Sequence, residues 1–260
     1  MNKPMEQPIA VFDSGVGGIS VLQELRRLMP QEDYLFFGDT AHAPYGERST
    51  EEVRALTLTH CETLLRQGAK ALVVACNTAT SAAAETLRAG HPEVPIIGME
   101  PALKPAVLAF PGGRIIVMAT VTTLREEKFN RLLNQYRDRA EIIPLPGAGL
   151  VELIEHGVLN GPQLEQRLRQ LLLLYHDADA VVLGCTHYPF IRRAIQAQLD
   201  HAAIFDGGAG TARETQRRLR EIGLCRPAGR LGQVSFASSS SDPAALELMR
   251  RLAARTVVTD

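Results

Sequence analysis

The chain of 260 residues is 45% hydrophobic and 22% charged, which is typical of a globular protein large enough to bury a substantial core. Its formal net charge of -1 offers no overall attraction to nucleic acid or to an anionic membrane surface. No apolar run approaches the roughly 18 residues of a membrane span, and residues 1–8 lack the apolar core of a secretory signal. We therefore expect a cytoplasmic protein that requires neither a membrane nor nucleic acid.

Short runs rich in β-branched residues alternate along the chain with amphipathic helical patterns. The predicted strands are Ile9–Phe12, Tyr34–Phe37, Ala71–Ala75, Pro95–Gly98, Arg114–Met118, Glu141–Pro144, Ala180–Leu183, Ala203–Phe205 and Val234–Ala237. The predicted helices include Gly18–Leu28, Thr50–Arg66, Leu124–Gln135, Gly161–Tyr175 and Thr211–Ile222. A last helix should start at Asp242 and Pro243, capped by the serine run 238–241. This alternation predicts an α/β fold with mainly parallel sheets flanked by helices, which places ligands at the carboxyl ends of the strands.

A polar strand end and a cysteine strand end recur in the same order in two parts of the chain. Asp13 is followed by Cys76, and Thr120 is followed by Cys185 at a nearly equal separation. The identity between the two parts is too low to prove a duplication. The order nevertheless predicts two similar α/β domains whose strand ends face one cleft.

The segment 13–18, DSGVGG, joins the first predicted strand to the first predicted helix. Its glycines match neither the GxGxxG spacing of dinucleotide sites nor a P-loop, so a tight turn is the favoured explanation for them. Asp13 either faces a ligand or caps the helix, and its spacing does not decide between the two. The loop 38–46, GDTAHAPYG, is stiffened by proline and glycine; it is either an ordinary turn or a loop that presents Tyr45 to a ligand.

Cys76 and Cys185 each end an apolar strand and precede hydroxyl or amide side chains and then a helix. A single cysteine in this position is usually a small packed hydrophobe, whereas two at equivalent positions favour a chemical role. A helix N-terminus beyond each thiol would favour its thiolate. For Cys61 and Cys225 we expect no chemical role.

Three kinds of chemistry could use the two thiols. A metal site needs more ligands than Cys185 and His187 supply, and a Cys–His hydrolase leaves Cys76 without a role. Proton transfer uses both thiols, because inversion of a carbon centre removes a proton from one face and delivers another to the opposite face. A thiol suits this task, since its pKa of about 8.5 allows both protonation states near neutral pH.

No cofactor is expected from the sequence. A pyridoxal enzyme needs a Schiff-base lysine, and none of the chain's four lysines ends a predicted strand. Fingerprints of flavin and nicotinamide sites are also missing from the sequence. We therefore predict a reaction that proceeds without a cofactor and without a metal ion.

Taken together, the motifs resemble those of bacterial glutamate racemases in the aspartate/glutamate racemase superfamily. The matching segments are DSGxGG at 13–18, PYG at 44–46, CNTA at 76–79 and GCTHYP at 184–189, in the family's order over nearly the whole chain. The related aspartate racemases typically carry glutamate where His187 stands. The resemblance implies cofactor-independent interconversion of L- and D-glutamate, which supplies D-glutamate for peptidoglycan.

The resemblance also implies roles for individual residues. Cys76 would be the base acting on D-glutamate, and Cys185 the base acting on L-glutamate. Asp13 would assist Cys76, His187 would assist Cys185, and Glu152 would be a further acidic group near the second thiol. The substrate would be held by Asp13, Ser14, Tyr45, Gly46, Asn77, Thr78, Thr120, Thr186 and His187.

The family fold implies one α/β domain at 1–99 plus 210–260 and a second at 100–209, with the active site in the cleft between them. The chain departs from the family at Ala119, where glycine is more common before the threonine. The resemblance leaves open whether the chain forms a homodimer and whether a cell-wall precursor activates it. From another class, the alternative is a non-catalytic two-lobed protein that binds amino acids, against which the missing secretory signal argues.

Overall fold

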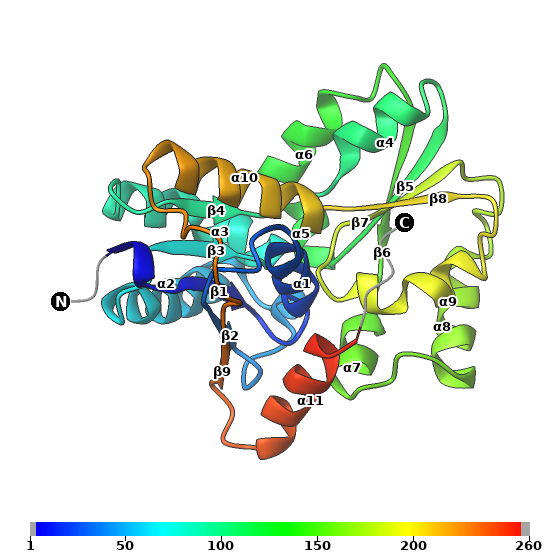
Figure 1. Ribbon diagram of the computed structural model, residues 1–260. Coiled ribbons are helices and arrows are strands. Elements are labelled where there is room, and N and C mark those ends of the chain that lie inside the picture. Colours follow the sequence, from blue (N-terminus) through cyan, green and yellow to red (C-terminus); the bar gives the residue numbers. More distant parts are fainter. Residues whose placement is uncertain (1–3, 256–260) are drawn as a thin grey trace.

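The computed structural model describes residues 4–255 and contains two separate parallel sheets, one in each lobe of the molecule (Figure 1). The first sheet has the order β4-β3-β1-β2-β9, with β4 at Ile96–Gly98, β3 at Ala71–Val74, β1 at Ile9–Asp13, β2 at Tyr34–Gly38 and β9 at Val234–Ser238. The second has the order β6-β5-β7-β8, with β6 at Glu141–Pro146, β5 at Arg114–Ala119, β7 at Ala180–Leu183 and β8 at Ala203–Asp206. The predicted α/β class with two parallel sheets is confirmed.

Helices cover the sheets and connect their parallel strands. They are α1 (Ile19–Leu28), α2 (Thr50–Arg66), α3 (Asn77–Gly90), α4 (Leu103–Ala109), α5 (Val121–Arg125), α6 (Glu127–Asn134), α7 (Leu150–Glu155), α8 (Pro162–Leu172), α9 (Arg192–Gln196), α10 (Gly208–Glu221) and α11 (Pro243–Ala253), with short 3-10 helices at Pro4–Glu6, Tyr45–Glu47 and Tyr188–Ile191. None of the helices within residues 4–255 combines the length and apolar character that a membrane span needs.

Two parts of the helix prediction can be compared in detail with the structure. The last helix starts at Pro243, as expected, but its cap is Asp242 and not the serine run, because the Asp242 carboxylate accepts a hydrogen bond of 2.9 Å from Ala244 N. The single helix predicted at 124–135 is wrong. Glu126 has extended backbone angles (φ -65°, ψ 137°) and divides the segment into α5 and α6. Its carboxylate accepts a hydrogen bond of 2.7 Å from Thr50 Oγ1, so a contact with α2 accompanies the break.

The central strands of both sheets are buried on both faces. Every residue of β1, β3 and β7 is buried, which explains why these strands are continuous apolar runs rather than alternating ones. One hydrophobic cluster extends from Val73 in the first sheet to Val181 in the second. The two lobes therefore share a packed core and hold their strand ends in a defined relation to each other.

The C-terminal part of the chain returns to the first sheet. Strand β9 pairs in parallel with β2, and α10 and α11 both pack against α1. The strands of the first sheet all lie within 1–99 plus 210–260, and those of the second within 100–209. We propose the domain boundaries on this distribution.

A buried ion pair ties the returning segment to the first sheet. The Lys70 ammonium lies 2.5 Å from Glu32 Oε2 and also donates hydrogen bonds to the Met5 and Leu224 carbonyls, while Glu32 Oε1 accepts one of 2.7 Å from Arg226 N. Both charged side chains are inaccessible to solvent. Removing one charge would leave the other buried without its partner, which costs several kcal/mol.

We therefore expect Lys70→Met to lower the free energy of unfolding by about 3 kcal/mol. The measurement is urea-induced unfolding followed by circular dichroism. Lys128→Met is the matched control, because Lys128 forms a partly exposed ion pair of 2.9 Å with Glu100 and should cost less than about 1 kcal/mol. Equal effects of the two substitutions would contradict the role given to the buried pair.

Candidate active site

Side chains from both sheets meet where β1, β3, β5 and β7 end. Asp13 ends β1, Cys76 follows β3, Thr120 follows β5 and Cys185 follows β7. The cavity between them is lined by Ser14, Pro44, Tyr45, Gly46, Cys76, Asn77, Thr78, Thr120, Val151, Gly184, Cys185, Thr186 and His187. Apart from Asp13 and Glu152, which are not among the lining residues, the structure thus brings every residue predicted for the site to one cavity.

Cys76 is the N-cap of α3, and its sulfur accepts a hydrogen bond of 3.4 Å from Ala79 N. This contact favours a thiolate, as the sequence suggested. Burial has the opposite and larger effect: it raises the pKa of Cys76 to about 11, and the nearby charge of Asp13 acts in the same direction. The surroundings of Cys76 therefore favour its protonated form near neutral pH.

Asp13 is fully buried and connects the two lobes. Its Oδ1 accepts a hydrogen bond of 2.9 Å from Gly15 N, and its Oδ2 accepts one of 3.1 Å from Thr186 Oγ1. Helix α1 begins after Gly18 without a side-chain cap, so of the two roles open to Asp13 the structure does not use the capping one. Burial raises the pKa of Asp13, although the neighbouring His187 and the hydrogen bond from Gly15 act against it.

The second thiol stands at one end of a hydrogen-bonded chain. Cys185 Sγ lies 3.6 Å from His187 Nδ1, and His187 Nε2 lies 2.6 Å from Glu155 Oε1. Burial alone would lower the pKa of His187, but its contacts with Cys185 and Glu155 raise it well above the ordinary value. These contacts therefore favour the protonated form of the imidazole that lies beside the sulfur.

The acidic group at this second thiol is Glu155 and not Glu152, which corrects the sequence-based assignment. Both carboxylates lie on the short helix α7, three residues apart. Glu152 faces Glu47, whose pKa it raises through contact between the two carboxyl groups. Among the described residues, no hydrogen bond joins Glu152 to Cys185 or His187, whereas Glu155 contacts the histidine directly. The i, i+3 spacing of two glutamates was the only signal in the sequence, and it could not show which one points inward.

The glycines of the β1–α1 turn are needed for space. A Cβ atom on Gly15 would lie 1.9 Å from Glu155 Oε1, and one on Gly17 would lie 2.4 Å from His187 Nδ1. Neither glycine has a positive φ, so the backbone angles alone would accept other residues. The turn is tight, as expected. Its glycines are needed because the first lobe lies very close to the His187–Glu155 pair.

Hydroxyl and amide groups cover the rest of the cavity wall. Thr78 Oγ1 lies 3.2 Å from Thr120 Oγ1 and 3.0 Å from Thr123 Oγ1, and Thr120 caps α5 by accepting a hydrogen bond of 3.1 Å from Thr123 N. The sequence analysis did not single out Thr123. Both amide atoms of Asn77 are buried without a hydrogen-bond partner in the described part of the chain. Because buried polar groups are normally paired, this amide is available to a ligand.

The cavity is small in this conformation. It leaves about 10 Å³ for the centre of a water-sized sphere, which is room for about one water molecule. An amino acid is larger, so the lobes or the loop at 44–46 must move to admit one.

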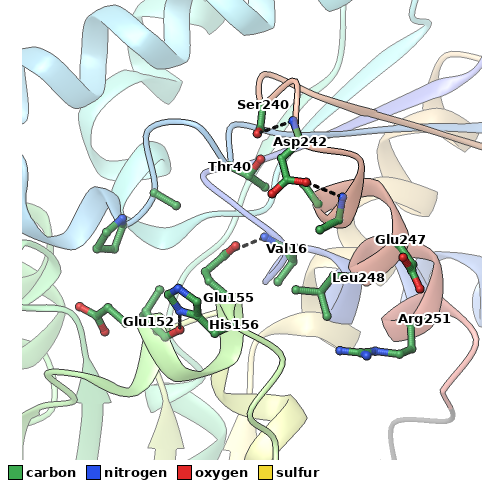
Figure 2. A pocket seen from close by; sticks show the side chains of 15 residues that line it. Val16, Thr40, Glu152, Glu155, His156, Ser240, Asp242, Glu247, Leu248 and Arg251 are labelled. Carbon is green, nitrogen blue, oxygen red and sulfur yellow. Dashed lines mark hydrogen bonds between the residues drawn. The ribbon is translucent and has the colours of Figure 1, made fainter.

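A larger cavity of about 550 Å³ adjoins the site between α7, α11 and the loop at 40–44 (Figure 2). Glu155 lines this larger cavity, and its Oε1 accepts a hydrogen bond from Val16 N. The same oxygen accepts a hydrogen bond from His187 Nε2 in the thiol site. Glu152, Asp242 and Glu247 add negative charge to the wall. Glu155 therefore lies between the larger cavity and His187.

Comparisons with known proteins identify the family of the chain. The model of the Asp/Glu/Hydantoin racemase family matches residues 17–215. A glutamate racemase of Clostridium perfringens is 47% identical over 248 residues, which are 94% of this chain and 95% of the relative. The glutamate racemase of Thermus thermophilus in complex with β-chloro-D-alanine is 38% identical, has a TM-score of 0.81 and is matched over 96% of this chain and 94% of its own. The Escherichia coli glutamate racemase in complex with L-glutamate and the activator UDP-MurNAc-ala is 30% identical, with a TM-score of 0.82 and 95% of each chain covered.

The Glu155–His187 contact makes a direct prediction. Glu155→Gln removes the negative charge but keeps an oxygen that can accept from Val16 N, so the pKa of His187 should fall. The measurement is the pH titration of the His187 ring by NMR. Glu152→Gln is the matched control on the same helix and should leave that titration nearly unchanged. A larger effect of the control than of Glu155→Gln would restore the assignment to Glu152.

Proposed function

We propose that this chain, which belongs to the Asp/Glu/Hydantoin racemase family and is an isomerase, interconverts L- and D-glutamate with Cys76 and Cys185 as its two acid–base groups. The observation that carries the proposal is the pair of buried thiols that end β3 and β7 and line one cavity from different lobes. A reaction that inverts a carbon centre needs acid–base groups on both faces of that carbon. Glutamate as the substrate is supported by the glutamate racemases to which the chain is similar.

The two thiols differ in a way that suits conversion of L- to D-glutamate. The His187 cation favours a thiolate at Cys185, which would remove the α-proton, while Cys76 with its raised pKa keeps the proton that it would deliver to the opposite face. One proton leaves the carbon and another reaches it, so Cys185 ends as the thiol and Cys76 as the thiolate. That state is the starting point for D-glutamate, and proton exchange with water restores the first state.

Asp13 and His187 would assist different thiols. The charge of Asp13 opposes a thiolate at Cys76 and so keeps this thiol protonated before L-glutamate reacts. His187, held by Glu155, would stabilise the thiolate of Cys185. In this proposal Glu155 is a positioning residue, since it touches the histidine and not the substrate.

The cavity wall offers partners for the substrate's polar groups. The unpaired amide of Asn77, the hydroxyls of Ser14, Thr78, Thr120 and Thr186, and the first N–H groups of α3 can bind carboxylates without an arginine. Tyr45 and Gly46, in the loop at 44–46, form another part of the cavity wall. Closing the lobes over the substrate would exclude water, so that thiols and dipoles act in a medium of low dielectric constant.

The proposed setting is the cytoplasm, with D-glutamate supplied for peptidoglycan. All four cysteines are free, which is typical of a reducing compartment. Activation by a cell-wall precursor is supported only by the Escherichia coli relative, whose structure holds UDP-MurNAc-ala. Adding that compound to an activity assay tests it, and sedimentation analysis tests whether the chain forms a homodimer.

Optical rotation of an L-glutamate solution tests the activity itself. Decay of the rotation to zero without added cofactor or metal supports a racemase. A stable rotation together with saturable binding of glutamate would instead indicate a two-lobed binding protein. An acyl adduct on only one of the two thiols would indicate a Cys–His hydrolase.

We expect Cys76→Ala and Cys185→Ala each to lower kcat about 1,000-fold in both directions, because each direction needs one thiolate and one thiol. Circular dichroism should show an intact fold, since each change removes only a sulfur atom at the cavity. Cys225→Ala is the control, because this half-buried cysteine lies outside the cavity and should keep its activity. Near-normal activity in either active-site variant would exclude that cysteine from the mechanism.

Deuterated water tests the geometry of proton transfer. Both thiols exchange with solvent before substrate binds, so Cys76 should deliver deuterium to the face opposite the proton that Cys185 removes. Early D-glutamate should carry deuterium at the α-carbon while the remaining L-glutamate stays largely unlabelled, as measured by mass spectrometry after chiral separation. A single base serving both faces would return much of the substrate's own proton, and early D-glutamate rich in α-protium would refute the two-thiol mechanism.

A further inference from the structure

A second cluster of titratable side chains lies beside the cavity, behind Tyr45. It consists of Asp39, which follows β2, of His42 in the next loop and of His60 in α2. One ligand atom from each of the three lies within 4.8 Å of the other two. Within residues 4–255 this is the one group of three His, Cys, Asp or Glu side chains close enough to hold a metal ion together.

The carboxylate of Asp39 is at the centre of the cluster. It is fully buried; His42 Nδ1 lies 2.7 Å from Oδ1, and His60 Nε2 lies 3.3 Å from Oδ2. Both imidazoles turn a nitrogen toward this carboxylate, and the Tyr45 hydroxyl also contacts it.

Hydrogen bonding within the protein does not satisfy the whole cluster. Despite its short distance from Asp39, His60 Nε2 is buried and has no hydrogen-bond partner in the described part of the chain. Buried imidazole nitrogens are normally paired, so this atom calls for a partner that the neighbouring side chains do not supply. A cation placed between the carboxylate and the two rings would be that partner.

We propose that Asp39, His42 and His60 form a binding site for a divalent transition-metal ion, with Zn²⁺ as the expected occupant. Two imidazoles and one carboxylate suit zinc and its neighbours, whereas Mg²⁺ and Ca²⁺ prefer oxygen ligands only. Metal–ligand bonds of about 2.0–2.2 Å put tetrahedral ligand atoms about 3.4 Å apart. The present separations from the Asp39 oxygens are 2.7 Å for His42 Nδ1 and 3.3 Å for His60 Nε2, so the His42 ring would move away from the carboxylate when an ion binds.

The surroundings of the cluster fit a bound ion. The His42 side chain is 41% exposed, so an ion and a water ligand can enter from the loop side. The Tyr45 hydroxyl donates a hydrogen bond of 2.6 Å to Asp39 Oδ2 and so orients the carboxylate, while Oδ1, which contacts His42 Nδ1, would turn to the ion. The ion would brace the loop that carries Tyr45 and Gly46 without being a reactant, so the proposal is independent of the proposed racemase chemistry.

Absorption spectroscopy of full-length protein titrated with Co²⁺ tests the site. The titration uses a Cys76→Ala, Cys185→Ala background, so that active-site thiols cannot bind the metal. We expect one Co²⁺ per chain with visible d–d absorption, and its displacement by Zn²⁺. No uptake at about 1 mM Co²⁺, a concentration far above the dissociation constants of protein sites for transition metals, would overturn the proposal.

Substitutions locate the site. In the same background, His42→Ala and His60→Ala should each abolish the Co²⁺ spectrum. His60→Gln, which keeps a polar side chain at this position, should also abolish it. His201→Ala is the matched control, because His201 forms an exposed contact of 3.2 Å with Asp200 on the other lobe, and it should keep the spectrum. Circular dichroism verifies the fold of each variant. Retention of the spectrum after loss of either His42 or His60 would contradict the three-ligand site.

Discussion

The carboxylate of Glu155 joins the two lobes at the place where the proposed chemistry occurs. One oxygen accepts a hydrogen bond from Val16 N in the first lobe and another from the His187 ring in the second. The first lobe approaches so closely that the β1–α1 turn leaves no room for a side chain at Gly15. The position of the imidazole beside Cys185 depends on this shared contact.

The two thiols are alike in the sequence but not in their surroundings. Cys76 lies near the negative charge of Asp13 and has a raised pKa, while Cys185 lies beside an imidazole with a raised pKa. The two sulfurs thus have neighbours of opposite character, a carboxylate beside Cys76 and an imidazole beside Cys185. In the proposed mechanism this difference lets one thiol start as the acid and the other as the base, although both must exchange roles in the reverse direction.

The small cavity between the thiols has to open before a substrate can bind. The volume left beside the thiols holds about one water molecule, so a substrate enters only when the lobes or the loop at 44–46 open. That loop is held through the hydrogen bond from Tyr45 to Asp39, which is also the centre of the proposed metal site. Tyr45 therefore lines the proposed substrate cavity and also connects its loop to Asp39.

The sequence by itself determined the α/β class, the parallel strands and the location of both thiols, because apolar runs of strand length end where polar residues begin. It also placed Asp13, Thr120 and His187 at the same strand ends. Only the tertiary structure decided which glutamate of α7 meets His187, since packing of a short helix, and not the spacing of its residues, sets which side chain points inward. The same holds for the break at Glu126, where a contact with Thr50 accompanies the end of α5, and for the raised pKa of Cys76. In each case the deciding energy comes from burial or from a partner distant in sequence, which no local pattern contains.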